Sequence, residues 1–69
     1  MDLEELRRKA ERALEAETKA LNSLLEISRN AGEDAEELLS TVIFETALHR
    51  EIMRGIIAAV DLTRRAGES

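Results

Sequence analysis

The sequence predicts an all-α fold, in which two antiparallel helices form a hairpin that associates into a four-helix bundle as a homodimer or higher oligomer. Three observations lead to this prediction. The chain has no proline and almost no aromatic residues, its apolar residues recur at helical spacing, and its only cluster of turn-forming residues lies near the middle. The length of 69 residues fits a single domain over residues 1–69.

The first helix is expected over residues 2–29. Asp2 and Glu5 have the spacing of a capping box just before an apolar periodic segment. When the sequence is written as heptads, two rows of mostly apolar residues appear. One row comprises Leu3, Ala10, Glu17 and Leu24. The other comprises Leu6, Ala13, Ala20 and Ile27, with Leu14 and Leu21 beside them. Glu17 is the charged member of this otherwise apolar stripe.

A turn is expected over residues 30–32. Asn30 and Gly32 both tolerate the left-handed backbone conformation that commonly ends helices. The chain therefore reverses direction there.

The second helix is expected over residues 33–66, with 67–69 frayed. Acidic residues begin it and Arg64 and Arg65 end it, which complements the helix dipole. One heptad row comprises Ala35, Val42, His49, Ile56 and Thr63, and the other Leu38, Glu45, Ile52 and Ala59, with Leu39, Met53 and Val60 alongside. Again polar residues, Glu45 and His49, interrupt the stripe at its middle.

A second apolar set, which includes Phe44, Leu48 and Leu62, covers much of the rest of this helix. One partner helix cannot cover so much apolar surface. The sequence therefore predicts self-association, and it leaves a second apolar face available to a protein partner.

Charge and hydropathy argue against two classes of partner. The net charge of −5 and the lack of a basic stripe disfavour nucleic acid. The longest apolar run, 56–60, is too short to span a bilayer, and the acidic first residues do not resemble a signal peptide. We therefore expect no membrane partner and a cytoplasmic location.

The polar residues of the two stripes are expected to meet. Glu45 and His49 lie four residues apart and so share one helix face. With the turn centred at Ala31, Glu17 and Glu45 are equidistant from it and should lie level in an antiparallel hairpin. A dimer would double this set to four carboxylates and two imidazoles, which suits a pair of divalent ions, with iron, manganese or zinc as candidates.

These residues resemble half of a ferritin-like di-iron carboxylate bundle, a family in which small members dimerise two hairpins. The resemblance extends over essentially the whole chain, but family members carry Glu, two residues, then His, whereas three residues separate Glu45 from His49. It implies that Glu17, Glu45 and His49 are metal ligands, that iron is the favoured ion, and that any activity is that of a di-iron or di-manganese oxidoreductase of ferroxidase type.

Metal-free interpretations remain open. His49 can be a core histidine hydrogen-bonded to Glu17 or Glu45, and the glutamates can form a buried polar layer that fixes register and oligomeric state. The chain would then be a non-enzymatic oligomerisation or interaction module. A designed hairpin is also consistent with the abundance of alanine, leucine and glutamate.

Overall fold

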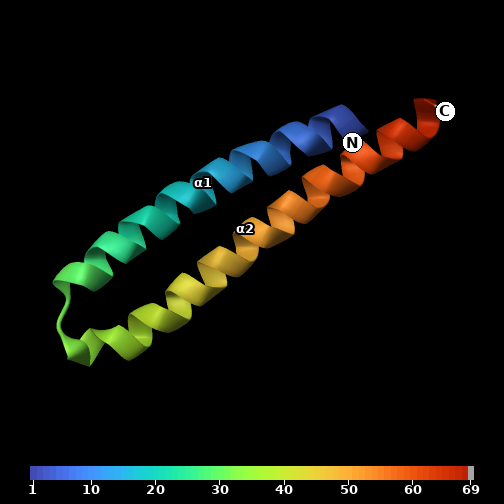
Figure 1. Ribbon diagram of the computed structural model, residues 1–69. Coiled ribbons are helices and arrows are strands. Elements are labelled where there is room, and N and C mark those ends of the chain that lie inside the picture. Colours follow the sequence, from blue (N-terminus) through green and yellow to red (C-terminus); the bar gives the residue numbers. More distant parts are fainter. Residues whose placement is uncertain (69) are drawn as a thin grey trace.

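The computed structural model describes residues 1–68, except for the side chain of Glu68, and consists of two helices. Helix α1 spans Leu3–Asn30 and helix α2 spans Glu33–Glu68. They run antiparallel as a long hairpin (Figure 1), which confirms the predicted all-helical hairpin. Helix α2 includes two residues that were expected to fray, Gly67 and Glu68, whereas Ser69 lies outside the described residues.

The start of α1 is capped by Asp2. The backbone N–H of Glu5 donates to Asp2 Oδ1 at 2.7 Å, and the N–H of Leu6 donates to the Asp2 carbonyl at 3.0 Å. These bonds satisfy early donors that would otherwise lack a partner, and such a cap contributes about 1 kcal/mol. The Asp2 half of the predicted capping box is therefore confirmed.

The turn between the helices forms without a left-handed residue. No residue in the described part of the chain has a positive φ, so the expected left-handed conformation is wrong. Instead Ala31 is extended, with φ −83° and ψ 149°, and its N–H donates to the Ile27 carbonyl at 2.9 Å. The Asn30 side chain donates to the Glu26 carbonyl at 3.0 Å, so two carbonyls at the helix end find partners without a left-handed turn.

The helices pack along one line of contact, which we call the seam. Its buried and half-buried members are Ala10, Leu14, Glu17, Leu21, Leu24 and Ser28 of α1, and Ala35, Leu39, Ile43, Thr46, Arg50, Met53, Ile57 and Val60 of α2. These positions follow one another at spacings of three or four residues, as in coiled-coil packing. Among residues 1–67, only Ala10, Thr46 and Val60 are buried, with 3–8% of each exposed, so the core is thin.

Of the predicted heptad rows of helix α2, only Ala35 lies in the seam. Leu38, Val42 and Ile52 of those rows are exposed, whereas Leu39, Met53 and Val60, which were expected only alongside, lie in the seam. The reason is that α2 is apolar over more than half of its circumference. Periodicity alone therefore cannot decide which apolar stripe meets α1.

The register between the helices also differs from the expected one. Three polar pairs cross the hairpin: Glu4–Arg64 at 3.0 Å, Arg7–Asp61 at 2.9 Å and Thr18–Arg50 at 3.0 Å. With Thr18 opposite Arg50, the last residue of α1 lies opposite residue 38, so the first turn of α2 extends past the end of α1. As a result the neighbour of Glu17 across the hairpin is His49 rather than Glu45.

The open end of the hairpin is held by a two-point ion pair. Arg7 Nε donates to Asp61 Oδ1 at 2.9 Å and Arg7 Nη2 donates to Asp61 Oδ2 at 3.3 Å, and Arg7 also contacts Glu11 in the next turn of α1. The hydrogen bonds and positive charge of Arg7 lower the pKa of Asp61 below its ordinary value. This pair therefore makes the stability of the hairpin depend on pH.

The sign of that dependence follows from linkage. Because folding lowers the pKa of Asp61, its stabilising effect is present above the ordinary carboxyl pKa and is lost as pH falls through the folded value. We expect Asp61→Asn to lower the melting temperature at pH 7, and we expect this difference from the parent chain to close as pH falls through the lowered pKa of Asp61. Circular dichroism melts from pH 7 to 2.5 measure both. Glu15→Gln, in an exposed pair with Lys19, is the control. If the melting temperatures of Asp61→Asn and the parent chain differed equally at pH 7 and at pH 2.5, the expectation would be wrong.

The seam predicts a second effect. Val60 is 3% exposed, so Val60→Ala should lower the free energy of unfolding by about 1–3 kcal/mol through lost burial and a small cavity. Leu62→Ala, at a position 63% exposed, should change it by less than about 0.5 kcal/mol. Urea denaturation followed by circular dichroism compares the two, and similar losses would mean that the seam is wrongly placed.

Candidate functional site

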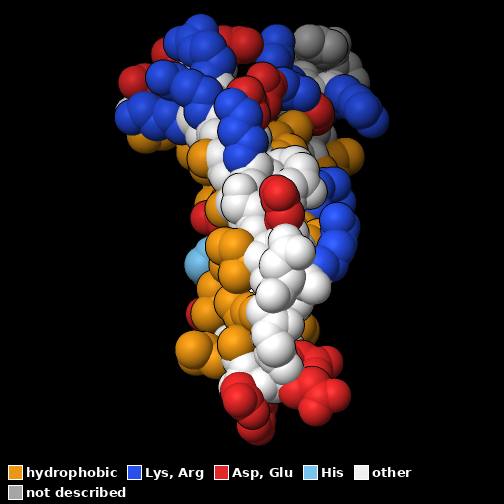
Figure 2. All heavy atoms as spheres, turned by 90° about the vertical axis from the view of Figure 1, so that its left-hand side faces the viewer, with side chains coloured by type: hydrophobic (Ala, Val, Ile, Leu, Met, Phe, Trp, Pro, Cys, Tyr) orange, Lys and Arg blue, Asp and Glu red, His pale blue; other side chains and the backbone are white. Residues whose placement is uncertain are grey.

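A broad apolar surface lies beside the seam. We call it the open apolar face, and it consists of Leu6, Ala13, Ala20 and Ile27 of α1 and Leu38, Val42, Ile52, Ile56 and Ala59 of α2. In each helix these positions flank the seam on the same side of the hairpin. Figure 2 shows hydrophobic side chains along one edge of the molecule, with the histidine among them.

The other side of the hairpin is polar. Arg7 and Asp61 meet there, and Arg50 Nε donates to Thr18 Oγ1 at 3.0 Å. The cross-helix hydrogen bonds thus gather on one side of the seam and the open apolar face lies on the other. This division makes the apolar side the candidate binding surface.

The Glu17–His49 pair lies at the centre of the open apolar face. Glu17 is midway between Leu6 and Ile27, and His49 is midway between Leu38 and Ala59. The distance from Glu17 Oε1 to His49 Nδ1 is 3.6 Å, which is longer than a direct hydrogen bond. The Glu17 side chain is 30% exposed and that of His49 is 54% exposed, so both can be reached from the open side.

The third predicted ligand is placed differently. Glu45 is exposed on α2, one helical turn before His49. Within residues 1–68, no three His, Asp or Glu side chains lie close enough together to hold a metal ion. One chain therefore brings together two of the three predicted ligands, Glu17 and His49, and leaves Glu45 apart from them.

Sequence reasoning missed the polar residues that do enter the seam. Arg50 is half-buried, and its Nε donates to Thr18 Oγ1. Thr46 is buried, and its hydroxyl donates to the Val42 carbonyl at 2.8 Å. The only sequence signal was the spacing of Ile43, Thr46 and Arg50 with Met53, which alternates by three and four.

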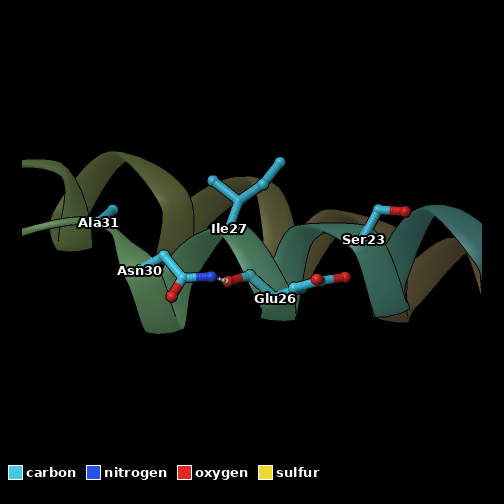
Figure 3. A pocket seen from close by; sticks show the side chains of 5 residues that line it. All are labelled: Ser23, Glu26, Ile27, Asn30 and Ala31. Atoms are coloured by element: carbon cyan, nitrogen blue, oxygen red, sulfur yellow. Dashed lines mark hydrogen bonds between the residues drawn. The ribbon is translucent and has the colours of Figure 1, made fainter.

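A shallow, open hollow lies at the turn end of α1. It is lined by Ser23, Glu26, Ile27, Asn30 and Ala31 (Figure 3). Ile27 belongs to the open apolar face, and the Asn30 amide is already engaged with the Glu26 carbonyl. The hollow thus extends the apolar face toward the turn.

A separate outer patch lies on α2, away from α1. It comprises Phe44, Leu48 and Leu62, whose side chains are exposed. Leu48 lies four positions after Phe44, but Leu62 is a further fourteen positions along, with Glu51 and Gly55 on the same helical face between them. The patch is therefore narrower and more interrupted than the open apolar face.

Comparison with protein-family models, curated proteins and solved structures finds no match to this chain. Neither helix, over the residues described, combines the length and apolar character needed to cross a membrane.

Proposed function

We propose that this protein is a self-associating helical hairpin, in which the open apolar face of one copy packs against that of another to form a four-helix bundle. The observation that carries the proposal is the exposure of large apolar side chains on this face, such as Leu38 at 71% and Ile52 at 49%. Contiguous apolar surface on a soluble helix pair marks an interaction site. The partner that fits best is a second copy, because the same face then supplies both sides of the interface.

The shape of the single hairpin supports the proposal. Its accessible surface is 5247 Å², whereas a compact 7.7 kDa protein exposes about 4,300 Å². Its radius of gyration is 16.0 Å, against about 11 Å for a compact domain of this length. A chain with so thin a core gains stability from association, since chains of this size rarely obtain enough from one core.

A charge placed on the open apolar face tests this proposal. Ile52→Lys should shift the protein from dimer to monomer in native mass spectrometry, because the interface would then desolvate an unpaired ammonium group. We expect the dissociation constant to rise by at least about tenfold.

Leu62→Lys is the matched control, since it introduces the same charge on the outer patch of the same helix. It should leave the dimer intact. If Leu62→Lys dissociates the dimer and Ile52→Lys does not, the interface is on the outer patch and the proposed face is wrong.

The Glu17–His49 contact favours a second candidate function, a ferritin-like metal site at this interface. Each chain contributes a carboxylate and an imidazole on the face that association would cover, with Glu45 one turn from His49. Two chains would supply two copies of Glu17, Glu45 and His49. Carboxylate and imidazole ligands suit iron first, with manganese or zinc as alternatives.

In that case the bound metal would supply redox or Lewis-acid chemistry, and oxidase or ferroxidase activity follows from the family resemblance. The role of the chain is to hold the ligands. Glu17 and His49 approach from different helices, so the seam fixes their separation, and Glu45 would complete the set from the exposed side of α2.

Metal binding is tested by native mass spectrometry before and after anaerobic addition of Fe(II), together with elemental analysis. We expect two ions per dimer, and we expect both Glu17→Ala and His49→Ala to abolish stoichiometric uptake while the dimer persists. Glu15→Ala, at an exposed position outside the face, is the control. Full uptake by either ligand variant would exclude the site, and a dimer that ignores Fe(II), Mn(II) and Zn(II) would leave self-association alone.

A further inference from the structure

The charge on the hairpin is divided between its two ends. Residues 26–37, around the turn, carry five Asp or Glu side chains against one arginine. Residues 1–12 and 54–68, at the open end, carry seven Lys or Arg side chains against six Asp or Glu, so this end is close to neutral but holds most of the basic residues. Figure 2 shows acidic side chains at the turn end and most of the basic ones at the other. The hairpin therefore has an acidic pole and a basic pole.

The apolar face does not by itself fix how two copies are arranged. Because the face is centred on Glu17 and His49, a two-fold axis through that point covers it in either of two ways. An axis along the hairpin places both turns at the same end. An axis across the hairpin places the turn of each copy beside the open end of the other.

The charges distinguish these two arrangements. The first sets two acidic poles side by side, with ten carboxylates against two arginines. The second sets each acidic pole beside a basic pole. Charges at the edge of an interface select among alternative arrangements through such repulsion and attraction.

The positions of individual charges agree with the second arrangement. In the across dimer, residues equally far from the axis on the same helix come level. Asp34 and Arg64 are equidistant from His49, as are Glu33 and Arg65, and Arg8 and Glu26 are equidistant from Glu17. Three of the five acidic side chains at the turn end thus come level with a basic side chain of the partner subunit, whereas Glu36 comes level with Leu62 and Glu37 with Asp61.

We infer that two copies pack with their hairpins pointing in opposite directions, about a two-fold axis perpendicular to the hairpin at the level of Glu17 and His49. This inference rests on the proposed self-association and specifies its geometry. The axis places both Glu17–His49 pairs at the centre of the bundle, with α1 against α1 and α2 against α2 of the partner subunit. Any site built from these pairs is incomplete without the partner.

A distance between labels at the turn tests the geometry. Gly32 accepts a side chain, since an added Cβ meets nothing within 4 Å and its φ is not positive. Gly32→Cys carrying a nitroxide label, in the full chain, should show a label-to-label distance of about 45 Å by pulsed electron spin resonance. That value follows from fifteen residues at about 1.5 Å rise on each side of the axis.

Two other results of the distance measurement would contradict the dimer direction or the self-association, respectively. A distance of about 10–20 Å, alone or together with the long one, would place the turns at the same end and overturn the inference while self-association stands. No dipolar coupling, with a monomeric mass at the same concentration, would overturn self-association itself.

Neutralising the charges of the acidic pole gives a second test, because it would change the affinity of the dimer in opposite directions in the two arrangements. The combined change Glu33→Gln, Asp34→Asn, Glu36→Gln and Glu37→Gln should weaken the across dimer by about tenfold at 50 mM salt, with less effect at 500 mM because salt screens the charges. The same change would tighten a dimer with both turns at one end. Glu15→Gln with Glu51→Gln, at exposed mid-hairpin positions, is the control and should have little effect.

Discussion

The packing of α1 against α2 along a single seam is the constraint on which the other features of this molecule depend. Two helices can shield only one stripe of each other, and among residues 1–67 that stripe buries Ala10, Thr46 and Val60 alone. The remaining apolar residues of α2 extend well beyond the width of the seam. The hairpin is consequently elongated and exposes more surface than a compact domain of its mass.

The two sides of the hairpin differ in polarity. The Arg7–Asp61 and Arg50–Thr18 bonds lie on one side of the seam and leave few apolar residues there. On the opposite side the apolar face is interrupted at its centre by Glu17 and His49. The exposed apolar residues and the Glu17–His49 contact therefore lie on the same surface, and under the proposed self-association one interface serves both structure and ligand binding.

The proposals of self-association, dimer direction and metal binding form a sequence in which each later one depends on the first. The dimer direction uses charges at the two poles and is independent of the Glu17–His49 pair. Metal binding uses that pair and requires the partner copy, because one chain brings together only two candidate ligands. A metal-free bundle with Glu17 and His49 as a polar layer would retain the same dimer.

The sequence by itself determined the two helices, the cap at Asp2 and the position of the turn, whereas the expected level pairing of Glu17 with Glu45 is not what the structure shows. These features follow from the helical spacing of apolar residues, from capping chemistry and from the turn-forming residues in the middle of the chain. Only the tertiary structure decided that Glu17 lies beside His49, that Thr46 and Arg50 enter the seam, and that Leu38, Val42 and Ile52 remain exposed. The physical reason is that α2 is apolar over most of its circumference. The rotation and register of α2 are therefore set by the overhang of its first turn and by the cross-helix pairs of Arg7 and Arg50. Neither the overhang nor these pairs can be read from a local sequence pattern.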